Sequence, residues 1–317
     1  MPDSDSAAFR LFDAGAVARG LADRPLIEAL RAAFAAGAEA PRRQVHPLSD
    51  GALLAVMPIW RETHGAVKLA TLFPGNAARG APTIQALVVL FDGQTGAPIA
   101  LADGAEITLR RTAAASALAA DYLAQADASR LLMIGTGALA PHLIRAHAAV
   151  RPIAEVLVWG RDPAKASSVA ARAAAALPGL AVRAATDLAA AATRADVISC
   201  ATAAREPVLR GAWLKAGAHV DLVGSFSPDA READDDVIRD ARIFVDTREA
   251  ALTEAGDLLI PLAAGVIRSD DVVADLSDLC AGRVQGRRSA SEITVFKSVG
   301  AALEDLAAAQ LLMESLR

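Results

Sequence analysis

Cysteine is scarce, with only Cys200 and Cys280 among 317 residues. Two thiols are too few for a disulfide framework or for a thiolate metal site. The five histidines do not cluster with acidic residues. The nearest pair, His142 and His147, lies five positions apart and so does not share one face of a helix. We therefore expect no metal site.

The sequence also lacks an apolar run long enough to span a membrane. The longest alanine-rich stretch, "ASSVAARAAAALPGLAVRAA", is interrupted by Arg172, Pro178 and Arg183. A membrane-spanning helix needs about 20 consecutive, mainly apolar residues, which this stretch does not supply. The first residues, "MPDSDSAAFRLFD", are acidic and polar and do not resemble a secretory signal. A cytoplasmic protein without a membrane partner is the expectation.

The sequence has no excess of positive charge either. Lys and Arg number 32 against 37 Asp and Glu, which gives a net charge of −5, and the basic residues are scattered. Nucleic-acid-binding proteins gather basic residues on one face, so nucleic acid is not an expected partner. Apolar residues are abundant, at 54% of the total. A chain of this length and composition can form large cores and two domains.

The first part of the chain is predicted to mix helices with strands. "DRPLIEALRAAFAAG" has Pro25 near its start, apolar residues at helical spacing and Gly37 at its end, which predicts a helix. "ITLRRTAAASALAADYLA" predicts a second, alanine-rich helix. Between them lie four strand-like runs separated by turn residues: "ALLAVMP", "AVKLATLF", "QALVVLFD" and "PIALAD".

From about residue 126, short apolar strands alternate with helical segments. Buried strands in such an alternation are typical of a parallel sheet covered on both faces. We predict an α/β fold in which a doubly wound Rossmann domain (126–294) is inserted into an α+β domain (1–125 and 295–317). The predicted strands of the Rossmann domain are "SRLLMIG", "EVLVWG", "ADVISCAT", "HVDLVG" and "RIFVDT".

The segment "RLLMIGTGALAPHLIRAH" predicts a strand, a glycine turn and a helix. Gly135 permits the tight turn, Gly137 lets the backbone approach a pyrophosphate, and Ala140 allows close packing of helix on strand. An ordinary turn between strand and helix is the alternative, but a strand precedes the pattern and a second one ends about 25 residues later. We therefore assign Gly135, Gly137, Ala138 and Ala140 to a nicotinamide dinucleotide.

The end of the second strand, "VLVWGRDPAK", bears on the choice of cofactor. An NAD site normally offers a carboxylate to the ribose 2′-hydroxyl at this place. Here Gly160 stands at the tip and Arg161 follows, a cation suited to a 2′-phosphate. The sequence favours NADPH, with NADH possible if Asp162 serves the ribose instead.

Three basic residues stand out before the Rossmann domain. Arg43 precedes a strand, Lys68 lies inside the apolar "AVKLATLF", and Arg111 lies in the alanine-rich helix. A charge within an apolar strand needs a partner or a cleft, unless Lys68 faces outward. Arg110 and Arg111 point to different sides of their helix, so one of them is expected to face a ligand. Converging cations would bind a carboxylate.

Several motifs occur in an order that resembles a known family. They are the stretch beginning "VKLATLFPGN", the glycine turn, "GSFSPDARE", "FVDTREAALTEAGDL" and "ITVFKSVGAALED". From about residue 40 to 310 the chain resembles the ornithine cyclodeaminase/mu-crystallin family. The joint order of these motifs is more specific than the glycine turn alone.

The resemblance implies a homodimer whose first domain, closed by the C-terminal helix, binds substrate and forms the subunit contact. The Rossmann domain would present the nicotinamide. By the same resemblance, Arg43, Lys68 and Arg111 would hold a substrate carboxylate. The resemblance also places Thr83, Thr112 and Ser298 near the cofactor, and we assign Thr202 to the cofactor as well.

Phe226, in "GSFSPDARE", stands where ornithine cyclodeaminases and the similar archaeal alanine dehydrogenases carry an aspartate. An amino acid is an ammonium ion at neutral pH, and hydride can leave its α-carbon only as a base takes a proton from nitrogen. Phenylalanine cannot act as that base. Ala55 likewise stands where the cyclodeaminase pattern has an acid. A Phe226 turned into the core would leave the base equally absent.

These residues favour the reverse chemistry, the NAD(P)H-dependent reduction of a cyclic imino acid. Δ1-Pyrroline-2-carboxylate or Δ1-piperideine-2-carboxylate would give L-proline or L-pipecolate. Lys68 and Arg111 would clamp the carboxylate, and Phe226 would form an apolar wall against the ring. Two alternatives stay open: an ornithine cyclodeaminase that releases ammonia from L-ornithine, and a non-catalytic, mu-crystallin-like protein that binds NADPH or a small ligand.

Overall fold

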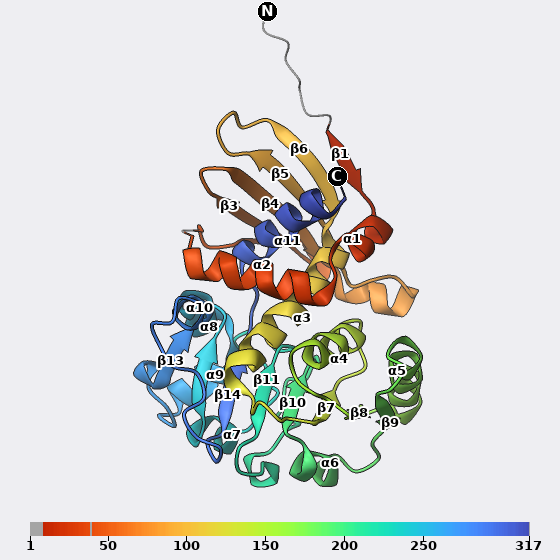
Figure 1. Cartoon of the computed structure of the whole chain (residues 1–317), viewed down its shortest axis with the longest axis vertical. Helices are drawn as coiled ribbons and strands as arrows, with labels where there is room; N and C mark the ends of the chain where they lie inside the picture. The colour runs from red at the N-terminus through yellow and green to blue at the C-terminus, as the bar shows by residue number, and fades with distance from the viewer. Residues whose placement is uncertain (1–8, 39, 317) are drawn as a thin grey trace, which may run out of the picture. The chain divides into compact units, whose positions relative to one another are not determined.

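The computed structural model describes residues 9–38 and 40–316, which form two compact units (Figure 1). Of these residues, unit 1 comprises 9–33, 37–111 apart from 39, and 302–316, and unit 2 comprises 34–36 and 112–301. Residues 1–8, which include most of the polar start that does not resemble a secretory signal, lie outside the described residues. Among the residues described, no helix combines the length and apolar character needed to cross a bilayer.

Unit 1 is built on a six-stranded sheet with the order β1-β6-β5-β4-β3-β2. The strands are antiparallel except for β1, which pairs in parallel with β6 at one edge. The helix α11 packs on β3, β4 and β5 (Figure 1). The helices and strands of this unit are β1 (Arg10–Phe12), α1 (Ala14–Gly20), most of α2 (Asp23–Ala36), β2 (Gln44–Pro47), β3 (Leu53–Trp60), β4 (His64–Leu72), β5 (Ile84–Asp92), β6 (Pro98–Asp103), the first part of α3 (Gly104–Leu123) and α11 (Ala302–Ser315).

The two faces of this sheet differ in burial. Lys68 is paired with Met57 and Val88 on the neighbouring strands, and these three side chains are buried on the face that α11 covers. The alternate residues point the other way. On that second face, Leu69 and Leu87 pair with each other and are 41% and 47% exposed. The sheet therefore has one covered face and one open, apolar face.

Unit 2 contains an eight-stranded parallel sheet in the order β13-β12-β14-β11-β10-β7-β8-β9. This confirms the predicted parallel sheet of an α/β fold. Its elements after α3 are β7 (Arg130–Ile134), α4 (Leu139–Val150), β8 (Glu155–Trp159), α5 (Pro163–Ala176), β9 (Ala181–Ala184), α6 (Leu188–Arg194), β10 (Val197–Cys200), β11 (His219–Leu222), α7 (Asp235–Arg239), β12 (Arg242–Val245), α8 (Arg248–Glu254), α9 (Gly256–Ala263), β13 (Val272–Asp275), α10 (Leu276–Cys280) and β14 (Thr294–Lys297).

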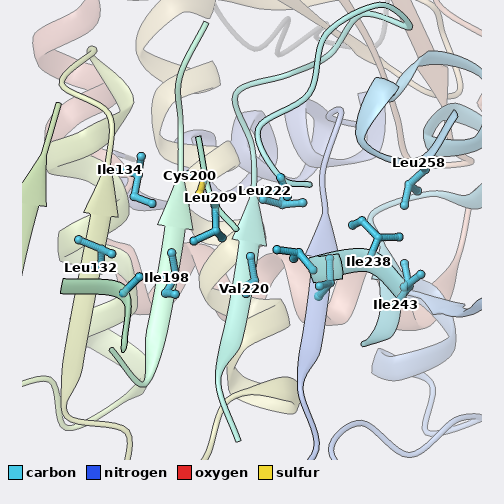
Figure 2. Packing of buried hydrophobic residues seen from close by; sticks show 14 of the residues in the cluster. Leu132, Ile134, Ile198, Cys200, Leu209, Val220, Leu222, Ile238, Ile243 and Leu258 are labelled. Carbon is cyan, nitrogen blue, oxygen red and sulfur yellow. The ribbon is translucent and has the colours of Figure 1, made fainter. Parts of the chain in front are cut away.

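The core of unit 2 follows from the alternation of side chains along its strands. Figure 2 shows apolar side chains from β7, β10 and β11 packing against Leu209, Ile238 and Leu258. The residues between them point to the opposite face, where the buried Asp221 accepts a hydrogen bond from Ser199 (2.6 Å) and contacts His147 Nε2 (3.2 Å). Both faces of the central strands are therefore covered, and only their ends can carry a ligand site.

Several elements differ from the sequence expectation. The short elements β1, α1, β9 and β13 were not predicted. The domain division expected after residue 294 falls at the first residue of β14, which lies in the middle of the parallel sheet between β11 and β12. The four residues of this strand are all buried, so β14 is an integral part of the unit 2 core.

Candidate active site

The glycine turn has the geometry expected of a dinucleotide site. Gly135 follows β7 with a φ of +128°, and a Cβ there would lie 2.4 Å from the carbonyl oxygen of Ala201. Only glycine satisfies both conditions. A Cβ on Gly137, by contrast, would meet no atom within 4 Å. The backbone at Gly137 is therefore open to the approach of a ligand.

The helix that follows the turn presents its N-terminus to the same place. α4 begins at Leu139, and its N-cap is Ala138, whose side chain has no hydrogen-bonding group. The first backbone N–H groups of a helix lack intrahelical partners and favour an anion such as a pyrophosphate. Ala140 is completely buried, as close packing on the sheet requires. These residues fit a nicotinamide dinucleotide.

A cavity of about 740 Å³ lies over this turn within unit 2. It is lined by the glycine turn, the end of β8 and the loop 201–208, and includes Gly135, Gly137, Arg161 and Thr202. The register places Ile134, Cys200 and Leu222 side by side as the last residues of β7, β10 and β11. Ligands of such sheets bind at the carboxyl ends of the strands. Position and size both suit a dinucleotide.

Arg161 and Asp162, which follow β8, have different surroundings. The Asp162 carboxylate caps α5, accepting hydrogen bonds from the backbone N–H groups of Ala164 (2.9 Å) and Lys165 (3.3 Å). Arg161 is exposed and lines the cavity, as does Lys165, which was not predicted. Cations therefore face the cavity here, while the nearby carboxylate stabilises a helix.

The other cofactor assignments are distributed over both units. Thr112 and Ser298 are buried in unit 2 but do not line the cavity, and the Ser298 hydroxyl donates to Asp246 (3.1 Å). Thr83 belongs to unit 1, where its carbonyl oxygen accepts a hydrogen bond from the N–H of Phe73 (2.8 Å). Their roles toward the cofactor stay predictions.

Lys68 and Arg111 of unit 1 lie in a buried ionic cluster that the sequence does not predict. Lys68 on β4 and Arg111 on α3 are 3% and 5% exposed. Lys68 Nζ contacts both carboxylate oxygens of Asp305 (2.8 and 3.0 Å). Arg111 Nε lies 3.2 Å from Asp305 Oδ1, and its Nη1 lies 2.6 Å from Glu304 Oε2. Two cations and two carboxylates thus share one site with no formal net charge.

The surroundings shift the protonation of Lys68. Burial lowers the pKa of Lys68 to about 8, and Arg111 acts in the same direction, although Asp305 and Glu304 oppose the change. The ammonium form still dominates at neutral pH. Arg110 faces elsewhere, pairing with Glu106 (2.6 Å) and donating to the Leu21 carbonyl (2.9 Å).

Arg43 lies apart from this cluster. It is half-buried and immediately precedes β2, which is two strands from β4 in the sheet. Three cations are expected to bind a substrate carboxylate, and the structure brings two of them, Lys68 and Arg111, together in one ionic cluster. Arg43 lies just before the first residue of the edge strand β2.

Phe226 lies in the loop after β11 and is 47% exposed, so its side chain is not turned into the core. The loop is held by its own polar groups. The Ser225 hydroxyl donates to the Ala230 carbonyl, and Ser227 Oγ lies 2.9 Å from Asp229 Oδ1. Position 226 thus presents an aromatic surface, with no carboxylate of its own.

The described part of the chain contains no candidate metal site. Within residues 9–38 and 40–316, no group of three or more His, Cys, Asp and Glu side chains could hold a metal ion. Ala55, on β3, is half-buried and pairs with Ala70.

Comparison with known proteins gives the family. The family model described as the ornithine cyclodeaminase/mu-crystallin family matches residues 17–317. The chain belongs to this family. It is 39% identical to a Delta(1)-pyrroline-2-carboxylate reductase of Colwellia psychrerythraea over 313 residues, covering 97% of this chain and 99% of the relative. It is 37% identical to the ketimine reductase mu-crystallin of Mus musculus, covering 92% and 91% of the two chains.

A solved structure agrees with this assignment. The Delta(1)-pyrroline-2-carboxylate reductase of Thermococcus litoralis, in complex with NADH and L-proline, superposes with a TM-score of 0.93 and 35% identity, covering 96% of each chain. The family expected from the order of the motifs is thus confirmed, and so is the fold class.

Proposed function

We propose that this member of the family is an NAD(P)H-dependent reductase of cyclic imino acids. Its substrates would be Δ1-pyrroline-2-carboxylate or Δ1-piperideine-2-carboxylate, and its products L-proline or L-pipecolate. The observation that carries the proposal is the exposed Phe226, because an aromatic ring replaces the base that amino acid oxidation needs. The named functions of the Colwellia and Thermococcus relatives support the same chemistry.

The reduction adds a hydride to C2 of the C=N bond and a proton to nitrogen. A reduced nicotinamide supplies the hydride when bound. Lys68 and Arg111 bind the substrate carboxylate, and Arg43 is a third cation that binds it. Asp305 and Glu304 hold the two cationic side chains in fixed positions before the substrate arrives, which reduces the entropy lost on binding. Phe226 excludes water from the imine.

One experiment separates this function from its alternatives. NADPH and NADH oxidation is followed with Δ1-pyrroline-2-carboxylate, and ammonia release is followed with L-ornithine and an oxidised cofactor. We expect rapid oxidation of the reduced cofactor with the imine and no ammonia from ornithine. Ammonia release at a comparable rate would identify a cyclodeaminase, and cofactor binding without turnover of either substrate would identify a non-catalytic binding protein.

NADPH is the cofactor that Arg161 and Lys165 favour. Both cations line the cavity, and Asp162 is engaged as a helix cap. Arg161→Asp should lower kcat/KM for NADPH by about tenfold or more, since a charge-assisted hydrogen bond contributes about 1.5–3 kcal/mol. The value for NADH, which lacks the 2′-phosphate, should change little. A wild-type protein with a markedly higher kcat/KM for NADH would contradict this preference.

A homodimer formed through the open face of the unit 1 sheet is the assembly that we propose. Leu11, Leu69 and Leu87 are 72%, 41% and 47% exposed, and exposed apolar surface on one face of a sheet is typical of an interface. Leu69→Asp combined with Leu87→Asp should give a monomer in size-exclusion chromatography with light scattering. Val45→Asp on the other face of the edge strand is the matched control and should remain dimeric. A monomeric wild-type protein would exclude the proposal.

A further inference from the structure

A second buried ionic cluster lies in unit 2, and the proposed reaction leaves it without a role. Glu232, Asp257 and Lys297 are completely buried. Lys297 Nζ lies 3.0 Å from Asp257 Oδ2 and donates to the carbonyl oxygen of Ser225. Asp257 Oδ1 accepts hydrogen bonds from the backbone N–H groups of Glu232 (2.7 Å) and Ala233 (3.2 Å). The cluster therefore links β14 and α9 to the segment that carries Phe226.

The Glu232 carboxylate joins two loops of the sheet's carboxyl edge. Its Oε1 accepts hydrogen bonds from the backbone N–H (2.7 Å) and the hydroxyl (2.8 Å) of Thr202, which follows β10 and lines the cavity. Its Oε2 accepts a hydrogen bond from the N–H of Gly224 (2.7 Å), which follows β11. All three donors point at one carboxylate, so both loops depend on it.

The two loops pack closely against each other at Gly224. A Cβ on Gly224 would lie 2.2 Å from both the nitrogen and the carbonyl oxygen of Thr202, and 2.6 Å from Glu232 Oε1. Real Cβ atoms do not approach other atoms so closely, so only glycine fits at position 224 between Thr202 and Glu232. Movement of Glu232 would displace the wall of the cavity at Thr202.

The position of this wall indicates which part of the cofactor it contacts. The cavity has Arg161 at the end of β8 on one side of the glycine turn and Thr202 after β10 on the other. A Rossmann domain binds one mononucleotide on each side of the central strand. If Arg161 marks the adenosine side, Thr202 belongs to the nicotinamide side.

We propose that Glu232 is a positioning residue for the nicotinamide half of the cofactor, and that its ionised form holds Thr202 and Gly224 in the binding geometry. The inference rests on the proposed function, since it takes the cavity as a nicotinamide dinucleotide site. An ionised carboxylate is a pure acceptor and satisfies all three donors. Protonation places an O–H donor on a carboxyl group that faces three other donors, so at least one of the three hydrogen bonds is then lost.

The groups around Glu232 decide where this protonation occurs. The titratable groups that face it are Lys297 from β14, Asp257 from α9 and Cys200 from β10. Burial raises the pKa of Glu232 to about 7, while Lys297 and the hydrogen bonds from Thr202 act against the rise and Asp257 adds to it. Burial also raises the pKa of the Cys200 thiol, so that group stays neutral. The ionised form of Glu232 is therefore lost as the pH falls through 7.

Equilibrium binding of NADH, followed by nicotinamide fluorescence without substrate, tests the inference. NADH is chosen because it lacks a 2′-phosphate, which would itself titrate near pH 6. For the wild-type protein, Kd should rise about tenfold from pH 8 to pH 6, in proportion to the loss of the binding-competent form. For Glu232→Gln, Kd at pH 8 should be on the order of ten- to a hundredfold higher and nearly independent of pH, because the amide NH₂ must face one of the donors.

Two controls separate positioning from stability. Asp221→Asn alters an equally buried carboxylate on β11, whose partners Ser199 and His147 lie outside the cavity wall. It should lower the melting temperature while the Kd for NADH keeps its wild-type pH dependence. Thr202→Ser, which retains the hydroxyl that donates to Glu232, should bind NADH more tightly than Thr202→Val, which loses it.

Wild-type affinity and wild-type pH dependence in Glu232→Gln would overturn the inference, even if imine reduction is confirmed. If that variant does not fold, a flat pH profile of the wild-type Kd would overturn it equally. A wild-type protein that binds no nicotinamide dinucleotide would instead overturn the proposed function itself.

Discussion

Lys68→Met should lower kcat/KM for the cyclic imine by roughly 30- to 5,000-fold, because the loss of a desolvated charge pair costs about 2–5 kcal/mol of transition-state binding. The expected loss is largest in KM, since the ammonium binds a carboxylate that is present in substrate and transition state alike. Affinity for NADPH should change much less, because Lys68 belongs to unit 1 and the dinucleotide cavity to unit 2. Steady-state kinetics and NADPH titration give the two values.

The ionic cluster requires a control for this variant. Lys68→Met leaves the buried Asp305 carboxylate with Arg111 as its remaining ion-pair partner, and breaking a buried pair destabilises a protein by about 3–5 kcal/mol. Lys68→Met combined with Asp305→Asn removes the carboxylate that has lost its lysine partner and should recover much of the stability in urea unfolding. Activity should not recover. A stable double variant with near-wild-type kcat/KM would remove Lys68 from the substrate site.

The lowered pKa of Lys68 adds a test in the unmodified protein. The charged form is lost as the pH rises through about 8, so the KM for the imine should increase above that pH. The same increase should be absent from Lys68→Met, which has no ammonium to lose. The comparison assigns the alkaline limb of the pH profile to this one residue.

Phe226→Asp should lower kcat/KM for imine reduction by about two orders of magnitude. A new carboxylate would repel the carboxylate of the substrate, and at an effective dielectric of ~20 two charges ~6 Å apart repel by roughly 3 kcal/mol. Attraction to a protonated imine nitrogen offsets part of this loss. Phe226→Asn provides the uncharged control and should cost less, whereas Phe226→Leu should retain most of the activity.

Gain of cyclodeaminase activity in Phe226→Asp should be weak, because Ala55 still lacks the second acid of the cyclodeaminase pattern. Ammonia release from ornithine is the measurement. Robust release by the unmutated protein would show that the base lies elsewhere and that position 226 does not decide the reaction.

The parts of the fold that could be predicted are those with a local signal. The glycine turn between β7 and α4 has both a strand before it and a helix after it, and each is visible in the apolar pattern. β9 and β13 have only four residues each and alternate in burial, so their apolar signal is too short to be distinguished from a loop. β14 lies within the motif "ITVFKSVGAALED", but its fully buried Lys297 does not resemble a core residue, so the pattern does not indicate a central strand.

The candidate site shows the same limit. The charge of Lys68 inside an apolar strand predicts a partner, but that partner, Asp305, lies 237 residues away. The sequence contains a signal for it, since Glu304 and Asp305 are acidic residues in the mainly apolar first half of α11, and buried acids need partners as buried cations do. Pairing them with Lys68 and Arg111 requires knowing that α11 packs on β4, which no local pattern specifies.

The place of β14 in the sheet has a consequence for the order in which the protein folds. β11 and β12 are separated in the sheet by a strand formed from residues 294–297, so their edges stay unpaired until the ribosome has synthesised that strand. The same delay applies to unit 1, whose sheet is covered by α11. Exposed strand edges in a nascent chain are prone to aggregation, and pairing between distant segments is slow. Neither unit can therefore complete its core before β14 and α11 have been synthesised, and the growing chain is expected to depend on chaperones until these two elements emerge.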